Sequence, residues 1–201
     1  NACELDPDEN CIGGPGLRTL LRFSIETPNI GDGDLFMGTP SADNDEFQYS
    51  TCHGHFHFVG YAEYKLVDDE GTEVAQGQKQ AFCLVDTGPF TDDPTISQSP
   101  KYSCGYQGIQ RGWSDVYASD LPCQFVDITG VPEGTYKLVL EVNAEQQIPE
   151  LDLTNNVVEL EVDIGDPNLK TPSEACPDGV PDHALLTTNR ECGWTEGTTL
   201  S

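Results

Sequence analysis

The stretch that most constrains this chain runs from Cys52 to Phe58 and reads CHGHFHF. It holds three of the four histidines in the sequence. Successive side chains of a strand point to opposite faces, so His53, His55 and His57 share one face and the phenylalanines between them point toward a core. A rise of about 3.3 Å per residue separates the outer two Cα atoms by about 13 Å. One metal ion can therefore collect all three imidazoles only if the outer rings lean inward, and Gly54 would allow that bend.

Neutral imidazole is a ligand for zinc, copper, nickel and iron, and copper(II) leads the affinity order. The pattern therefore predicts a transition-metal site. The alternative is a surface histidine cluster or an adventitious metal site.

The composition indicates one all-β domain. The 201 residues, 36% of them hydrophobic, include 20 glycines and 14 prolines, which is typical of many turns. Residues 134–143 and 157–164 alternate apolar and polar side chains, as two strands of a sandwich do. We predict a single-domain β-sandwich with long loops over residues 1–165. Residues 166–201 would form a disulfide-tethered extension packed on the same domain.

Other segments are less regular. We expect strands at residues 17–25, 77–86 and 113–117, and a strand running from the histidines to Val67. Residues 26–48 and 87–112 are rich in glycine, proline and polar side chains and predict two long loops. No apolar run reaches the roughly 18 residues of a membrane helix. Because the chain begins with Asn1, we expect a mature or trimmed form without its signal peptide.

The eight cysteines form no CxxC pair, which favours disulfides over a zinc ribbon. Disulfides are typical of an oxidising setting, so we expect a secreted, extracellular protein. The simplest pairings are Cys3 with Cys11 and Cys176 with Cys192.

The chain carries 35 acidic and 9 basic residues, for a formal charge of −26. Such a surface excludes nucleic acid as a partner and concentrates cations, including amines. The same charge is also typical of adaptation to high salt, whatever the activity.

Several collinear stretches together resemble the catalytic domain of the lysyl oxidase family, the copper-dependent protein-lysine 6-oxidases. In order and spacing they cover residue 3 to about residue 164. The main ones are residues 52–57 (CHGHFH), 77–84 (GQKQAFCL), 115–117 (DVY), 120–129 (DLPCQFVDIT) and 149–156 (PELDLTNN).

The resemblance implies that His53, His55 and His57 hold copper. It also implies that Tyr117 is oxidised to a quinone and that the Lys79 amine adds to its ring, giving lysine tyrosylquinone. Such an enzyme oxidises a primary amine, in the family a peptidyl lysine, to an aldehyde and releases H₂O₂ and ammonia. Its partners would be O₂ and a lysine-containing protein or a small amine. We expect a monomer, and the acidity indicates a microbial version.

The catalytic base has two candidates. Asp115 matches a family aspartate and shares a face with Tyr117 if the segment is extended. The alternative for Asp115 is a solvated or structural carboxylate. Glu63 stands where animal members of the family carry a histidine. His183 is remote in sequence and stays unassigned.

The resemblance also implies two disulfides. Cys52 and Cys104 match a family pair. Cys83 and Cys123 both lack their family partners, one of which falls at Trp113, so we expect them to bond each other. Such a bridge would hold the strand of Lys79 near Tyr117.

Residues 150–156 offer clustered hard oxygen ligands, which suit Ca²⁺. Family members bind calcium at the matching loop, and the candidate ligands here are Glu150, Asp152, Asn155 and Asn156. The alternative is a turn whose polar side chains cap the backbone.

Two other functions fit the same histidines. The main alternative is a non-enzymatic, metal-binding β-sandwich that serves as a binding or adhesion module. A zinc hydrolase with a three-histidine zinc hydroxide is the other.

Overall fold

The computed structural model describes residues 3, 9, 11, 12, 14, 16–77 and 80–165, with the side chains of residues 80 and 81 left out. These residues form thirteen strands and no helix, so the all-β prediction is confirmed. No helix long and apolar enough to cross a membrane occurs among them. The strands are β1 (Leu20–Arg22), β2 (Ile25–Pro28), β3 (Leu35–Gly38), β4 (Phe47–Ser50), β5 (His55–Val67), β6 (Glu73–Gln76), β7 (Gln80–Phe82), β8 (Gly88–Pro89), β9 (Gln107–Ile109), β10 (Trp113–Tyr117), β11 (Phe125–Asp127), β12 (Gly134–Val142) and β13 (Val157–Ile164).

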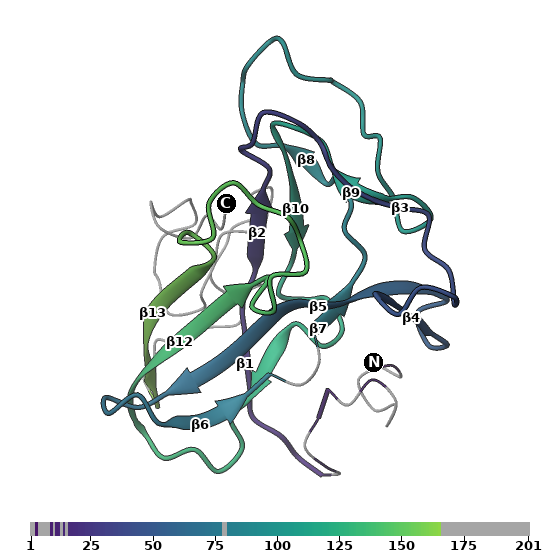
Figure 1. Cartoon of the computed structure of the whole chain (residues 1–201). Helices are drawn as coiled ribbons and strands as arrows, with labels where there is room; N and C mark the ends of the chain where they lie inside the picture. The colour runs from purple at the N-terminus through teal and green to yellow at the C-terminus, as the bar shows by residue number, and fades with distance from the viewer. Residues whose placement is uncertain are drawn as a thin grey trace, which may run out of the picture.

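Strand β5 is the centre of the largest sheet (Figure 1). It pairs antiparallel with β4, β6, β7 and β12, and β13 continues the sheet beyond β12. The alternating strands predicted at residues 134–143 and 157–164 are confirmed as β12 and β13. The histidine strand runs on to Val67 as predicted, and it ends at a turn in which Asp68 Oδ1 accepts the Glu70 and Thr72 N–H groups.

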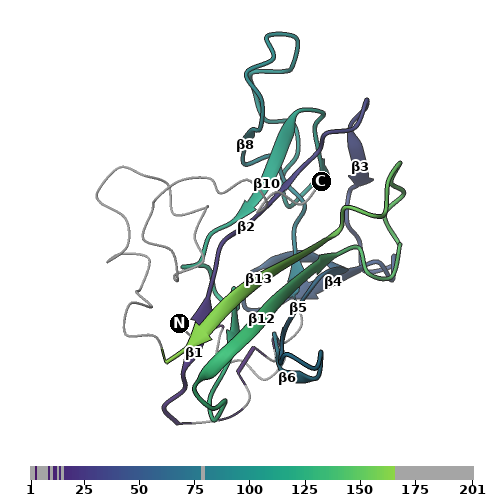
Figure 2. The same cartoon turned by 90° about the vertical axis from the view of Figure 1, so that its left-hand side faces the viewer.

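A second layer packs on this sheet. It contains the three-stranded sheet β2–β10–β8 and the pair β1–β11, and Figure 2 shows β2 and β10 beside each other, apart from β12 and β13. Aromatic side chains fill the space between the layers. The Phe23 ring lies 4.9 Å from the Tyr64 ring, and the Tyr61 ring lies 6.1 Å from the Tyr117 ring, between centroids. Burying such apolar surface is the main stabilising contribution to a fold of this kind.

Strand β5 changes its neighbours near Gly60. The pairing with β7 shifts register between Phe58 and Ala62, and Gly60 has φ of 76°, a conformation that disfavours residues with a Cβ. Because of this bulge, both Phe58 and Tyr61 are buried, with exposures of 0% and 1%, although strict alternation would put them on opposite faces.

The two predicted long loops contain strands. Residues 26–48 hold most of β2, all of β3 and the start of β4, and residues 87–112 hold β8 and β9. The strand expected at residues 17–25 is divided between β1 and β2, and only β7 forms a strand within residues 77–86. These strands span only two to four residues, too few to show an alternating pattern, so the glycine, proline and polar side chains around them predicted loops.

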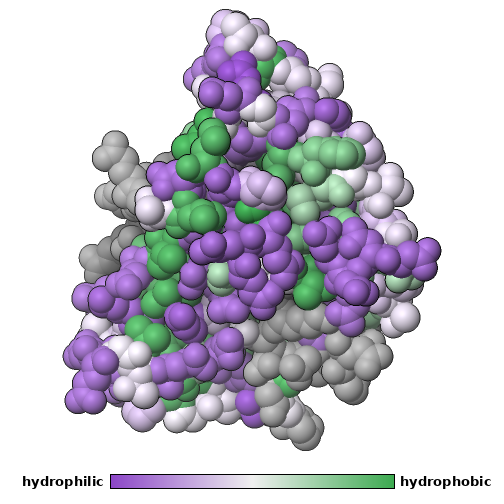
Figure 3. Space-filling view, viewed as in Figure 1, coloured by the Kyte–Doolittle hydropathy of each residue, from purple (hydrophilic) through white to green (hydrophobic). Residues whose placement is uncertain are grey.

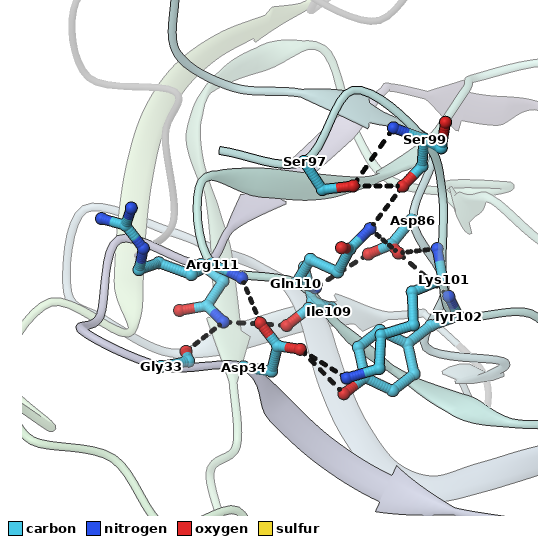
Figure 4. A network of polar contacts seen from close by, with 11 residues as sticks. Gly33, Asp34, Asp86, Ser97, Ser99, Lys101, Tyr102, Ile109, Gln110 and Arg111 are labelled. Carbon is cyan, nitrogen blue, oxygen red and sulfur yellow. Dashed lines mark hydrogen bonds and ion pairs between the residues drawn. The ribbon is translucent and has the colours of Figure 1, made fainter. Parts of the chain in front are cut away.

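Buried Asp86 anchors the segment between β8 and β9, which extends away from the main sheet in Figure 1. Its Oδ2 accepts the Lys101 and Tyr102 N–H groups and the Gln110 amide, and its Oδ1 accepts the Gln110 N–H (Figure 4). Asp34, from the loop before β3, accepts a hydrogen bond from Lys101 Nζ at 2.6 Å and so provides a second attachment for the same segment. The long loop is therefore fixed by carboxylates.

Three disulfides join described residues: Cys3–Cys52, Cys11–Cys123 and Cys83–Cys104. The predicted pairs Cys3–Cys11, Cys52–Cys104 and Cys83–Cys123 are therefore wrong. Cys3 and Cys11 are close in sequence, yet they bond to segments 49 and 112 residues away. Connectivity depends on which Cβ atoms the fold brings together, and spacing does not reveal this. The pair Cys176–Cys192 and the whole predicted extension at 166–201 lie outside the described residues.

The face seen in Figure 3 is largely hydrophilic, with apolar side chains in separate patches. Among exposed apolar residues, Ile30 and Phe36 are each 59% exposed and Leu151 is 91% exposed. These residues line a groove of about 660 Å³, bounded by residues 27–36 on one side and 148–155 on the other.

Candidate metal centre and quinone precursors

The three histidines converge on one point. Their ligating nitrogens lie within 4.8 Å of one another. The ring centroids are 5.7 Å apart for His53 and His55, 5.1 Å for His53 and His57, and 4.9 Å for His55 and His57. The strand begins only at His55, so His53 belongs to the preceding turn, where Gly54 has φ of 75°. Because of this bend, the His53 and His57 rings lie closer together than they would in a fully extended strand.

The donor set fits a transition-metal ion. His57 is 4% exposed, and the other two rings are half-buried. The Nε2 atom of His53 is buried and has no hydrogen-bond partner among the described residues. A buried nitrogen of this kind requires a partner, and a metal ion would be a suitable one. Burial lowers the pKa of His55, and a protonated His53 would lower it further, so the neutral, metal-binding form is favoured.

The N-terminal segment is attached to this histidine turn. The Ser50 hydroxyl donates to Glu9 Oε1 and accepts the His53 N–H at 3.0 Å. The Cys3–Cys52 disulfide joins the same turn covalently to the N-terminal segment. Glu9 also raises the pKa of His55 through its charge, opposing the effect of burial. Nothing in the spacing of the sequence signals this contact.

A second group of metal-binding atoms overlaps the first. His55 offers a nitrogen within 4.8 Å of the sulfurs of Cys83 and Cys104. These sulfurs are bonded to each other, so they are not thiolate ligands. The bridge instead places the segment after β7 directly beside the histidines.

Tyr117 is buried at the end of β10, 7% exposed. Its hydroxyl donates to the carbonyl oxygen of Cys83, and its ring lies 4.1 Å from the Phe82 ring, centroid to centroid. Phe82 is in turn 6.4 Å from the His57 ring. Burial first, and then the charge of Asp115, raise the pKa of the Tyr117 phenol well above its usual value. The phenol is therefore neutral at physiological pH.

Asp115 lies two residues before Tyr117 and is 1% exposed. Its Oδ2 accepts the Val85 N–H at 3.3 Å, and its Oδ1 has no hydrogen-bond partner among the described residues. Burial raises the pKa of this carboxyl well above its usual value, although the Val85 bond opposes the shift. Glu63, the other candidate base, is exposed and pairs in register with Glu141 on β12.

Gln107 links strand β5, which carries His55 and His57, to the segment after β7 that contacts Tyr117. This side chain is fully buried. Its amide nitrogen donates to the Phe56 carbonyl at 2.8 Å, and its amide oxygen accepts the Leu84 N–H at 3.1 Å. Sequence reasoning missed Gln107 and Phe82, because a glutamine in a polar loop and a phenylalanine in a strand have no distinctive pattern.

Lys79, the predicted partner of Tyr117, lies outside the described residues, as does His183. In the chain, Lys79 immediately precedes Gln80, the first residue of β7. Phe82, at the other end of this short strand, is the residue whose ring contacts Tyr117.

The candidate calcium loop bonds largely to itself. Glu150 Oε1 accepts the amides of Asn143 and Asn156, and Asp152 Oδ1 accepts the N–H and hydroxyl of Thr154. Glu150, Asp152 and Asn155 line the groove of 660 Å³. These hydrogen bonds are those of a capped turn, and the calcium assignment stays a prediction.

Fold and site together define a disulfide-stapled all-β domain with a three-histidine metal-binding cluster beside a buried tyrosine. The chain matches the Lysyl oxidase family over residues 8–172, which is most of its length. It therefore belongs to the lysyl oxidase family.

Named relatives agree with this membership. The chain is 40% identical to lysyl oxidase homolog 3B of Danio rerio over 147 residues, which are 71% of this chain and 17% of that protein. It is 36% identical to lysyl oxidase homolog 3 of Homo sapiens over 163 residues, 75% of this chain and 21% of that protein. Identity to lysyl oxidase homolog 2 of Bos taurus is 37% over 163 residues, with 75% and 20% covered. The matched region thus spans about a fifth of the length of these relatives.

Proposed function

We propose that this chain is the catalytic domain of a copper-dependent amine oxidase that converts primary amines, including peptidyl lysine, to aldehydes. The observation that carries the proposal is the convergence of three imidazoles beside the segment that holds Tyr117. The products would be the aldehyde, ammonia and H₂O₂, and the oxidant O₂. The disulfides and the family membership support an extracellular location.

His53, His55 and His57 would hold the copper ion. Copper, with O₂, would supply the oxidation that converts a tyrosine ring to a quinone, and it would support reoxidation afterwards. The chain contributes neutral imidazoles, because burial lowers the pKa of His55. Glu9 and the Cys3–Cys52 disulfide would fix the orientation of the turn that carries His53.

Tyr117 and Lys79 would be the precursors of lysine tyrosylquinone. Three features support Tyr117: its burial, its bond to the Cys83 carbonyl and its contact with Phe82 in the strand that follows Lys79. The amine of Lys79 must lose a proton before it can attack a ring, and partial desolvation favours this loss.

Asp115 would act as the base that accepts the α-proton of the bound amine. Burial raises the pKa of this carboxyl, which makes its ionised form a stronger base toward the α-proton. Its unpartnered Oδ1 is the atom that would accept the proton. Glu63 is the weaker candidate because its side chain is exposed.

Copper loading in the presence of O₂ tests the proposal. We expect the intact mass to show a crosslink between Lys79 and Tyr117 and the protein to gain a visible quinone absorption band. Addition of n-butylamine should then release H₂O₂. Lys79→Ala and Tyr117→Phe should each abolish H₂O₂ release while retaining bound copper.

A colourless, unmodified chain after complete copper loading would contradict the oxidase. That result would favour the binding or adhesion module, which keeps the metal and builds no quinone. Hydrolysis of an ester by the zinc-loaded chain, lost in His57→Ala, would instead favour the zinc hydrolase.

A further inference from the structure

Strand β10 separates two different environments. Asp115 and Tyr117 lie on the face described above, whereas Ser114 and Val116 alternate with them and line a cavity of about 610 Å³. Glu26 on β2 also lines this cavity, and it is the register partner of Val116. Residues 87–90, which include β8, complete the described lining.

Glu26 brings an incompletely satisfied carboxylate to this cavity. It is 4% exposed, and its Oε1 accepts the Ser114 hydroxyl. Its Oε2 is buried and has no hydrogen-bond partner among the described residues. Burial raises the pKa of this carboxyl above its usual value, although the Ser114 bond opposes the shift. A cationic ligand would offset the cost of burying the charge.

The described lining offers acceptors rather than donors. It contains no lysine, arginine or histidine, and Pro89 has no backbone N–H. The hydroxyl of Thr87 donates to the Ser114 carbonyl at 2.8 Å, and the hydroxyl of Ser114 donates to Glu26. Both hydroxyl protons are thus already used. A ligand that complements this cavity must supply hydrogen-bond donors and positive charge.

We propose that the cavity between β2, β8 and β10 is a binding subsite for a primary ammonium group on an aliphatic chain. The ammonium would pair with the Glu26 carboxylate and donate to the oxygens of Thr87, and the methylenes would pack on Phe90 and Val116. A divalent cation fits less well, because Ca²⁺ takes 6–8 oxygen ligands and Glu26 is the one carboxylate in the described lining. The chain's net charge of −26 would enrich such cations near the opening.

This subsite does not depend on the quinone, because it lies on the other face of β10 from Tyr117. Calorimetric titration of the full 201-residue Tyr117→Phe chain with n-butylammonium chloride isolates it, since that variant cannot form a covalent adduct with the amine. We expect saturable binding that 1-butanol and butyrate do not reproduce. Absence of saturable binding, or equal binding of 1-butanol, would overturn the proposal.

Glu26→Gln in the Tyr117→Phe background removes the charge and keeps the shape. We expect the affinity for n-butylammonium to fall at least about tenfold, the usual scale for loss of a charge-assisted hydrogen bond. The matched control is Glu73→Gln, which removes an exposed carboxylate from β6 and should leave the affinity unchanged. Equal affinities in both variants would place the ammonium elsewhere.

Val116→Phe provides a second route that leaves Glu26 intact. The larger side chain should fill part of the cavity and weaken n-butylammonium binding, with near-ultraviolet circular dichroism used to verify the fold. If Glu26→Gln does not fold, the affinity of Val116→Phe for n-butylammonium tests the proposal instead. Unchanged affinity in folded Val116→Phe would rule out the cavity as the binding site.

Discussion

The Tyr117 hydroxyl donates a hydrogen bond to the backbone carbonyl of Cys83, the residue whose disulfide to Cys104 lies against His55. A tyrosine on β10 and a histidine on β5 are thereby joined through one segment of chain. The metal cluster and the candidate quinone precursor share this support, so changes at one are expected to affect the other.

Tyr117→Phe should remove the proposed cofactor at a small cost in stability. The loss of one hydrogen bond to Cys83 costs about 1 kcal/mol, because the ring still packs on Phe82. We expect no quinone absorption and no amine-dependent H₂O₂, with copper stoichiometry unchanged. Retention of turnover would show that Tyr117 is not the cofactor precursor.

His57→Ala should greatly weaken copper binding. The cluster offers three imidazole nitrogens, and removing a direct ligand should exceed the roughly 10–100-fold loss that follows mutation of an outer-shell partner. Competition with a chromogenic chelator measures the affinity. His183→Ala is the control, because His183 is the one histidine outside the cluster and its loss should change nothing. Equal effects of the two substitutions would contradict the site.

A non-reducing peptide map should recover the linkages Cys3–Cys52, Cys11–Cys123 and Cys83–Cys104. Removal of the last bridge, in the double variant Cys83→Ser and Cys104→Ser, should lower the free energy of unfolding by about 3 kcal/mol for a loop of this size. Urea denaturation measures that change. Recovery of a Cys83–Cys123 peptide would contradict the described pairing.

Asp86→Ala should release the segment between β8 and β9. Four hydrogen bonds to its carboxylate would be lost, leaving donors of Lys101, Tyr102 and Gln110 without partners in a partly buried site. We expect a loss of about 3 kcal/mol in the free energy of unfolding and faster proteolysis within the segment. Asp92→Ala, an exposed position in the same segment, should behave like the parent chain. Equal proteolysis rates would argue against the anchor.

Asp115 should make the fold less stable as pH rises. Its folded pKa is raised above the usual 3.8 by burial, so the folded state holds the proton more tightly than the unfolded state. The free energy of unfolding should therefore fall from about pH 4 up to the folded pKa. Asp115→Asn should flatten this decline in urea titrations at successive pH values, whereas exposed Asp120→Asn should not. If the free energy of unfolding declined equally in Asp115→Asn, the decline would arise from other titrating groups.

Part of the site followed from the sequence because its signals are local. His55 and His57 share a face of β5 through strand alternation, and the turn at Gly54 brings the His53 ring to the same point. Alternation likewise predicted β12 and β13, because each buries one face. The short strands β3 and β9 span only four and three residues and gave no such signal, so their residues were assigned to loops.

The chain order alone could not decide which distant residues meet. Cys3 and Cys11 are eight positions apart yet bond to different partners, because the fold brings the histidine turn to one and the β11 region to the other. The contact of Tyr117 with Cys83, and the cavity that Glu26 shares with Ser114, likewise depend on strand register. Local periodicity thus predicted the candidate metal ligands and the class of fold. Only tertiary packing, which is set by contacts between residues far apart in the sequence, decided the position of Tyr117, the disulfide pairs and the burial of Glu26 on the other face of β10.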